Sequence, residues 1–66
     1  MKISWSIPKM KCDGCVQAIA ETLLMMEALK EVTVDLSAKK VEFEATDAAS
    51  AEEAKRALVR AGFPPA

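Results

Sequence analysis

The apolar residues of this 66-residue chain change their spacing along the sequence, and that change limits the possible folds. Residues 2–8 alternate between polar and apolar side chains, which is typical of a strand with one buried face. Pro8 should end this strand because proline cannot donate to a sheet ladder. From Cys15 onward the apolar residues recur every three or four positions, which predicts a helix capped by Asp13 and ending near Lys30. Its apolar face would consist of Val16, Ile19, Leu23 and Met26.

The second half of the chain first returns to alternation and then to helical spacing. Residues 31–46 alternate in two runs joined by residues 37–39, which predicts a β-hairpin with one wet face. Ser50 and Glu53 have the spacing of a capping box, so we expect a second helix to begin there. Gly62 is placed to lie just past the end of that helix. The apolar face of the helix would consist of Ala54, Ala57, Leu58 and Ala61.

The resulting order of elements is strand, helix, strand, strand, helix. This order predicts an α+β, ferredoxin-like βαββαβ fold, in which an antiparallel sheet carries two helices on one face. Only residues 63–66 remain for the fourth strand, and Pro64 and Pro65 cannot donate hydrogen bonds to a ladder. We therefore expect a short or absent fourth strand, which would leave the first strand without its outer neighbour. The length predicts one domain over residues 1–66.

The composition excludes several classes of protein. The net charge of -1 argues against a general nucleic-acid binder, since such proteins carry a basic excess. No apolar run approaches the roughly 18 residues of a membrane span, and the N-terminus lacks the pattern of a signal peptide. We therefore expect a cytoplasmic protein that does not insert into membranes. In a reducing compartment, two closely spaced cysteines are more often metal ligands or catalytic groups than a structural bridge.

The only cysteines are Cys12 and Cys15, between the first predicted strand and the first predicted helix. The partial positive charge of a helix N-terminus favours thiolate over thiol, and Cu(I) is a soft ion that prefers thiolate ligands. Gly14 would permit close packing and unusual torsions between the two sulfurs. A structural zinc site usually needs four ligands, whereas this chain has two sulfurs and no histidine. Zinc, cadmium or mercury nevertheless remain possible occupants of the pair.

The motif Met10-x-Cys12-x-x-Cys15, with this order of elements, resembles the heavy-metal-associated domain. That family includes small copper chaperones and the N-terminal metal-binding domains of metal-transporting P-type ATPases. The segments 32–36 and 61–63 also resemble the family, so the resemblance covers nearly the whole chain. It implies that Cys12 and Cys15 hold Cu(I) as a near-linear pair and that Met10 is a core residue rather than a ligand. Phe63 is expected to pack beneath the cysteine loop.

The function expected from these features is that of a metallochaperone, which hands its ion to a partner by thiolate exchange. No acid–base pair, activated nucleophile or phosphate-binding loop is visible, so we expect no enzymatic activity. Three alternatives stay open: a metal-binding domain of a transport ATPase, a carrier for mercury or cadmium, and a dithiol oxidoreductase. A redox site of the thioredoxin type usually has an aromatic residue before its first cysteine, where this chain has Lys11.

The predicted topology separates the charges along the molecule. The metal end would collect Lys9, Lys11, Lys39, Lys40 and Arg60 against Asp13 and Asp35. The opposite end would collect Glu27, Glu31, Asp47, Glu52 and Glu53, with Lys30 as its main basic residue. We therefore expect docking on an acidic surface of the partner, either a metal-transporting P-type ATPase or another thiolate acceptor. The chain is expected to act as a monomer, with a metal-bridged dimer as an alternative. The side chain of Lys11 could add positive charge near the thiolates.

Overall fold

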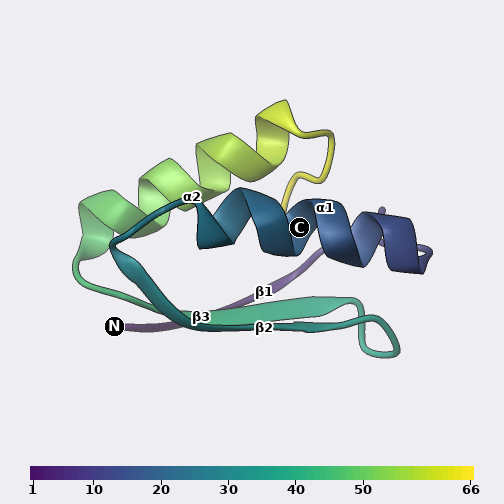
Figure 1. Ribbon diagram of the computed structural model, residues 1–66, viewed down its shortest axis with the longest axis horizontal. Helices are drawn as coiled ribbons and strands as arrows, with labels where there is room; N and C mark the ends of the chain where they lie inside the picture. Colours follow the sequence, from purple (N-terminus) through teal and green to yellow (C-terminus); the bar gives the residue numbers. More distant parts are fainter.

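The computed structural model describes all residues, 1–66. The elements are β1 (Lys2–Ser6), α1 (Asp13–Leu24), β2 (Leu29–Asp35), β3 (Lys40–Ala45) and α2 (Ala48–Arg60). Figure 1 shows both helices on the same face of the sheet, which leaves the other face open. The sheet is antiparallel with the order β1-β3-β2. The structure thus confirms the α+β ferredoxin-like fold, with three strands and no fourth.

The C-terminal residues replace the fourth strand with a single backbone hydrogen bond to β1. The backbone N–H of Ala66 donates a 2.8 Å hydrogen bond to the carbonyl oxygen of Ser6. Pro64 and Pro65 precede this contact and have no N–H to donate. The outer edge of β1 is otherwise without a neighbouring strand.

The core lies between the sheet and the two helices, and the central strand β3 supplies its middle. Val41, Phe43 and Ala45 of β3 are buried, while the residues between them are exposed, as the alternation predicted. Phe43 also meets Trp5 of β1 edge-to-face, with 5.2 Å between ring centroids. Most of the remaining buried apolar residues come from the helices and from the loop after β1: Ile7, Met10, Ile19, Leu23, Ala51, Ala54 and Leu58.

The predicted caps at both helix starts are wrong. The N-cap of α1 is Cys12, with an extended backbone, and Asp13 is already the first helical residue. The N-cap of α2 is Asp47, whose carboxylate accepts a 2.8 Å hydrogen bond from the backbone N–H of Ser50. Ser50 itself is 9% exposed, so it lies against the core rather than capping the helix from outside.

The helix α1 ends earlier than predicted, at Leu24, and Lys30 belongs to β2. Met26 consequently lies in the connecting turn, where it still packs half-buried against the core. The sequence reading also missed Leu29, which is buried at the start of β2. Between Lys30 and Thr33 the register shifts, and Glu31 adopts a positive φ of 54°. This bulge breaks the alternation, so that both Leu29 and Val32 can face the core.

The end of α2 agrees with the prediction for Gly62. Its φ is +93°, in the left-handed region that glycine adopts without a Cβ penalty. The N–H of Gly62 donates to the oxygen of Val59, and that of Phe63 to the oxygen of Leu58, which together form a Schellman motif. Ala61, however, is exposed at the C-cap, so its predicted place on the apolar face of the helix is wrong.

Candidate metal centre

The loop between β1 and α1 is held at its base by two fully buried side chains, Ile7 and Met10. The amide of Met10 donates a 3.0 Å hydrogen bond to the carbonyl oxygen of Ile7. The amide of Ile7 in turn donates a 2.7 Å bond to the carbonyl oxygen of Lys39 in the hairpin turn. Met10 is therefore a core residue, as the resemblance implied, and it anchors the chain just before Cys12.

The two cysteine sulfurs lie side by side at the N-terminus of α1. The Sγ atoms of Cys12 and Cys15 are 3.4 Å apart. Cys12 is exposed, whereas Cys15 is half-buried and packs against the core. A metal–thiolate bond is about 2.3 Å long, so a linear pair would need its sulfurs about 4.6 Å apart. Because Cys12 is exposed, a rotation of its side chain can provide the additional separation.

The environment of Cys15 favours its thiolate. The backbone N–H of Lys11 makes the largest contribution that lowers the pKa of Cys15, followed by a hydrogen bond from the side chain of Cys12. Burial raises this pKa, and the backbone N–H of Cys12 and the positive charge of Lys11 lower it by smaller amounts than that rise. The pKa of Cys15 is thus held below its usual value mainly by backbone dipoles, as expected beside a helix N-terminus.

No further ligands gather around the two sulfurs. The structure contains no group of three or more His, Cys, Asp or Glu side chains that could hold a metal ion. A closed four-ligand zinc site therefore cannot be built by one copy of this chain. None of the surface hollows is lined by Cys12 or Cys15. The pair lies at the start of α1 with Cys12 exposed, so another protein could reach it.

Gly14 lies in the first turn of α1 and does not have the unusual torsion that we expected. A Cβ built at this position would lie 3.7 Å from the Sγ of Cys12, which is an ordinary van der Waals distance. The role of Gly14 is therefore to leave space beside the side chain of Cys12, and not to allow an unusual backbone torsion.

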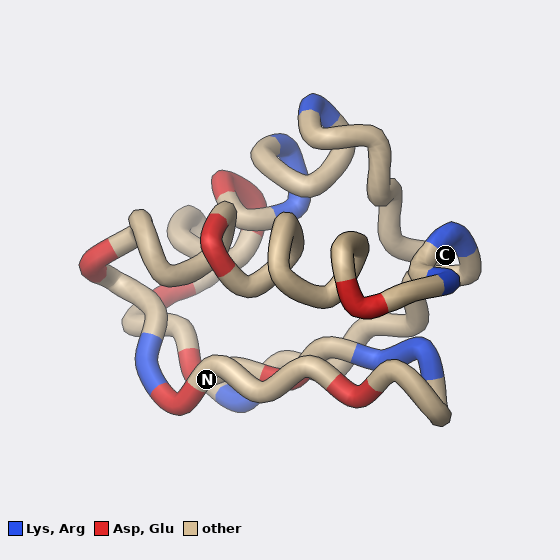
Figure 2. The backbone as a smooth tube through the Cα atoms, turned by 45° about the vertical axis from the view of Figure 1, so that its right-hand side comes forward, with Lys and Arg blue, Asp and Glu red and all other residues tan.

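The basic residues at this end of the molecule come from two segments. Lys9 and Lys11 lie in the cysteine loop, and Lys39 and Lys40 lie at the hairpin turn. The hydrogen bond between Ile7 and Lys39 brings these two segments together. Figure 2 shows the corresponding blue segments at one end of the backbone, with several red segments toward the opposite end. The predicted separation of charge is therefore present for these four lysines.

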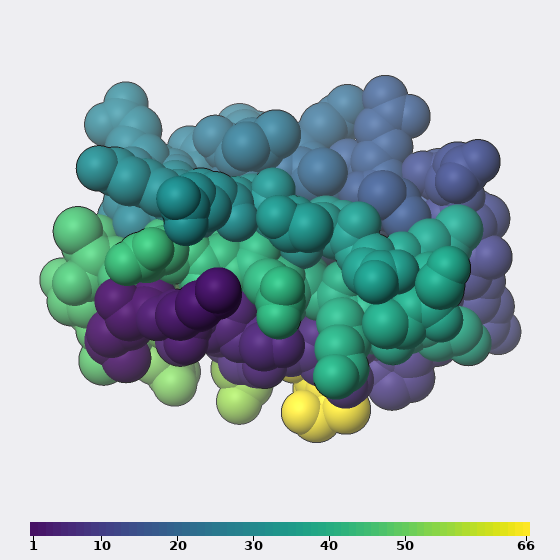
Figure 3. Space-filling view, turned by 90° about the horizontal axis from the view of Figure 1, so that it is seen from below, coloured from purple at the N-terminus to yellow at the C-terminus, as the bar shows by residue number.

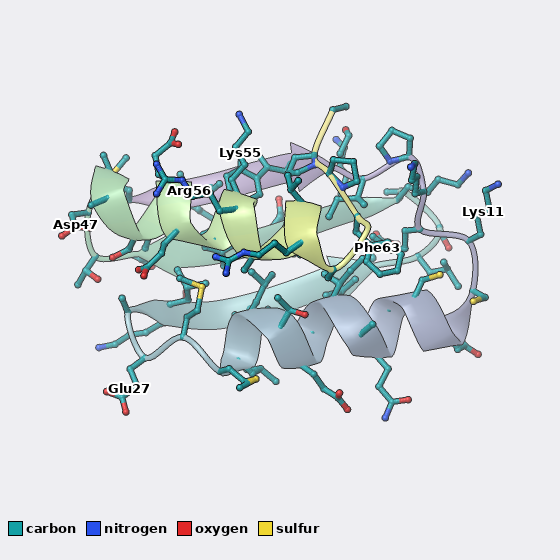
Figure 4. The ribbon with its side chains drawn as sticks, turned by 90° about the horizontal axis from the view of Figure 1, so that it is seen from above. Lys11, Glu27, Asp47, Lys55, Arg56 and Phe63 are labelled. Atoms are coloured by element: carbon teal, nitrogen blue, oxygen red, sulfur yellow. The ribbon has the colours of Figure 1, made fainter.

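The structure differs from the predicted charge distribution in the roles of Arg60 and Lys11. The prediction for Arg60 is wrong: with Met25, Met26 and Ala57 its side chain lines a shallow hollow beside the far end of α1. The side chain of Lys11 is exposed and extends outward from the loop (Figure 4), so its charge contributes least to the lowered pKa of Cys15. The backbone N–H of Lys11 contributes most to the lowered pKa of Cys15, and no sequence pattern could have revealed this contribution.

Phe63 follows the Schellman motif and is half-buried against the core cluster that contains Ile7 and Met10. Figure 4 shows it in the segment after α2, between the helix end and the side on which the cysteine loop lies. Its ring has no hydrogen-bond donor, so it can support the loop only by packing.

Comparison with known proteins decides the family. Residues 5–64 match the profile described as the heavy-metal-associated domain. The chain belongs to this family. As a heavy-metal-associated protein it binds heavy metals and is not an enzyme, in agreement with the expectation from the sequence. No helix is both long and apolar enough to cross a bilayer.

Several solved structures are similar to this one. A gold-binding protein is 34% identical, with a TM-score of 0.82 and coverage of 94% of this chain and 92% of that one. The apo form of CopP from Helicobacter pylori is 27% identical, with a TM-score of 0.86 and complete coverage of both chains. The copper chaperone Atx1 from Synechocystis PCC6803 is 26% identical, with a TM-score of 0.82 and coverage of 97% and 98%. A comparison with curated proteins gave no significant match.

Proposed function

We propose that the protein binds one soft metal ion through Cys12 and Cys15 and delivers it to the thiolates of a partner protein. Cu(I) is the first candidate for this ion. The observation that supports the proposal is the pair of sulfurs, 3.4 Å apart on an accessible loop, without a third ligand nearby. Such a donor set suits a soft ion that accepts two thiolates, and it does not suit zinc, calcium or magnesium.

The helix N-terminus supports the charge of the loaded site. A Cu(I) ion with two thiolates carries one net negative charge, and free N–H groups with the helix dipole stabilise an anion at this position. The lowered pKa of Cys15 also favours metal binding, since less free energy is needed to remove the proton of this thiol before the ion binds. The loop therefore favours the loaded state without an additional ligand.

Delivery would proceed by exchange of one thiolate at a time. An acceptor thiolate binds the ion while both cysteines still hold it, and the bond to the exposed Cys12 then breaks. A second acceptor thiolate replaces Cys15 in the same way. Each acceptor thiol gives up its proton as it binds, and each released cysteine can take one up. The ion thus keeps at least two sulfur ligands, and it never enters solution as a bare ion.

The four lysines around the loop suit a partner with an acidic docking surface. Lys9, Lys11, Lys39 and Lys40 would orient the loop toward that surface and raise the rate of encounter. We propose a metal-transporting P-type ATPase or another thiolate acceptor as this partner. The association rate should fall as ionic strength rises, and a rate independent of salt would contradict this part of the proposal.

A second candidate ion is Au(I), because the gold-binding protein is the relative with 34% identity. Au(I) is also a soft ion, so the same pair of thiolates could hold it. Mercury or cadmium carriage, service as a domain of a transport ATPase, and dithiol redox catalysis remain alternatives. A reduction potential and a turnover rate with a disulfide substrate would identify an oxidoreductase directly.

The test is an anaerobic titration of the reduced protein with Cu(I), Au(I), Hg(II) and Zn(II), followed by native mass spectrometry. We expect one Cu(I) per chain, bound more tightly than Zn(II). The double variant Cys12→Ala/Cys15→Ala should lose this binding. The control variant Met25→Ala removes an 84% exposed methionine away from the loop and should bind as the wild type does.

Either of two results would defeat the proposal. One is a double cysteine variant that retains the wild-type affinity for Cu(I). The other is a loaded wild-type protein that does not release its ion to a dithiol acceptor. A loaded species with twice the mass of one chain and a single ion would instead indicate a metal-bridged dimer.

A further inference from the structure

The outer edge of β1 is one of the two edges of the sheet that have no neighbouring strand. The strand order places β1 at one rim. In Figure 3, which views the open face of the sheet, the purple N-terminal strand lies along this rim with the yellow C-terminal residues near its end. An exposed strand edge presents unpaired backbone groups that can pair with another strand.

The direction of the free backbone groups follows from the pairing with β3. Residues of an antiparallel strand direct their N–H and C=O groups alternately to one neighbour and to the other side. The amide of Ile7 donates to the oxygen of Lys39, and the amide of Ala45 donates to the oxygen of Met1. The odd-numbered residues of this segment therefore face β3.

The even-numbered residues Lys2, Ser4 and Ser6 consequently direct their backbone groups outward. The bond from Ala66 to the carbonyl oxygen of Ser6 agrees with this direction, and it occupies that one group. The backbone groups of Lys2 and Ser4 remain available to a strand that approaches from outside.

The middle of this edge, at Ile3 and Ser4, lacks the features that usually prevent pairing. Natural edge strands are often blunted by proline, by a bulge or by a charge in the middle of the strand. β1 contains no proline, and its register with β3 runs without a shift. Its only charged residue is Lys2, at the first position.

Apolar side chains border the same edge. Met1 is 55% exposed, and Ile3 and Trp5 are only half-buried on the face that carries the helices. Lys55 of α2 points outward on the β1 side in Figure 4. Val59, one helical turn further, shares that side of α2 and is 51% exposed. A strand added to β1 would cover this apolar fringe.

We propose that β1 pairs antiparallel with β1 of a second copy, so that two three-stranded sheets form one sheet of six strands. In such a pair, the outward N–H and C=O groups of the even-numbered residues in one β1 strand must bond to those of the other. The register that leaves the bond between Ala66 and Ser6 intact is centred on Ile3, and it pairs Lys2 of each copy with Ser4 of the other. Four backbone hydrogen bonds then form across the axis.

This register is also compatible with the side chains. Ile3 lies opposite its own copy, and Met1 lies opposite Trp5, so apolar residues meet on the helix side of the sheet. On the open face each Lys2 lies opposite a serine, so no like charges are paired. Because the two strands run in opposite directions, the two cysteine pairs lie at opposite ends, and each stays accessible to its own partner.

The expected association is weak. Five residues of β1 provide an interface far smaller than the roughly 1,200 Å² of stable complexes, so we expect a dissociation constant on the order of 10⁻⁴ M. Sedimentation velocity from about 10 µM to about 1 mM spans this constant. A chelator and a reductant in the buffer exclude dimers bridged by metal ions or by disulfides.

We expect the apparent mass to rise from 7.1 kDa toward twice that value over this range. Ser4→Pro removes an outward N–H without affecting the bonds to β3, and it should keep the protein monomeric. Ser6→Pro is the matched control, since the N–H of Ser6 is not used in this register. Ser4→Lys changes only an exposed side chain and should also weaken the dimer, because it places two lysines opposite each other.

The variant Cys12→Ala/Cys15→Ala should dimerise as the wild type does, which separates this inference from the proposed metal function. A wild-type mass that stays at 7.1 kDa at the highest concentration would overturn the inference. Association of Ser4→Pro and Ser4→Lys with unchanged affinity would overturn it as well.

Discussion

The backbone N–H of Lys11 faces the sulfur of Cys15 and is the main reason that the pKa of Cys15 lies below its usual value. The thiol of Cys15 should therefore ionise at a lower pH than an ordinary cysteine thiol. Alkylation with a limiting amount of reagent, followed by peptide mass spectrometry, should show modification at Cys15 at a pH where an ordinary thiol is still protonated. A rate of Cys15 alkylation that rises only at the pH of a free cysteine would contradict this assignment.

The charge of Lys11 and its backbone N–H can be separated by mutation. Lys11→Met removes only the charge, which is the smallest of the contributions, so the alkylation profile of Cys15 should hardly move. Lys11→Pro removes the N–H and should raise the pKa of Cys15 toward its usual value. Circular dichroism must show that the proline variant keeps its fold. If Lys11→Met shifted the profile more than Lys11→Pro, the side chain would be the dominant group instead.

Met10 should be important for stability because its side chain is fully buried in the core. Met10→Ala should lower the free energy of unfolding by about 2–5 kcal/mol, and Met10→Leu by less than about 1.5 kcal/mol. Chemical denaturation measures both values. Met25→Ala is the matched control, since Met25 is 84% exposed and its truncation should have little effect. Equal losses for the two alanine variants would show that Met10 is not a core residue in solution.

Asp47 caps α2, and the N–H of Ser50 lowers the pKa of its carboxyl. A carboxyl with a lowered folded-state pKa stabilises the protein above its unfolded-state pKa, and that contribution is lost as pH falls through the folded-state value. Asp47→Ala should therefore lower the thermal midpoint at neutral pH by several degrees and reduce the loss of stability in acid. Asp47→Asn should keep most of the cap and remove only this dependence on pH. Thermal melts from neutral to acidic pH compare the three proteins.

The sequence predicted most reliably where burial alone decides the structure. The alternation of Val41, Phe43 and Ala45 is clear because β3 is the central strand and packs on one face only. The cysteine pair was also visible, since the two sulfurs and the start of the helix are local features. The buried face of α2 was predicted only in part, because its first turn was placed too late.

The failures occur where a choice depends on the tertiary structure. Asp47 and Ser50 are both good capping residues, and the burial of Ser50 decides between them. The positive φ of Glu31 has no signal in the sequence, because the residue type gives no reason to expect it. The bulge forms because Leu29 and Val32 both need to face the core. The contribution of the Lys11 backbone was hidden for a different reason, since every residue except proline has the same N–H.

The stability of the protein should respond in opposite ways to a methyl group added at Gly14, in the first turn of α1, and at Gly62, just after α2. Gly62 has a φ of +93° and no atom within 4 Å of a built Cβ, so only backbone strain opposes Gly62→Ala. That strain should reduce the free energy of unfolding by about 1–2 kcal/mol. Gly14 is helical, so Gly14→Ala should instead raise this free energy by about 0.5–1 kcal/mol.

The added methyl group at position 14 would also lie 3.7 Å from the Sγ of Cys12, which limits how far that side chain can rotate when a metal ion binds. Gly14→Ala should therefore bind Cu(I) more weakly than the wild type even though it unfolds less readily. Gly62→Ala should show a different combination, with lower stability and unchanged affinity for Cu(I). Denaturant titration and competition with a Cu(I) chelator measure the two quantities. A parallel change of stability and affinity in both variants would mean that fold stability, rather than the freedom of Cys12, controls binding.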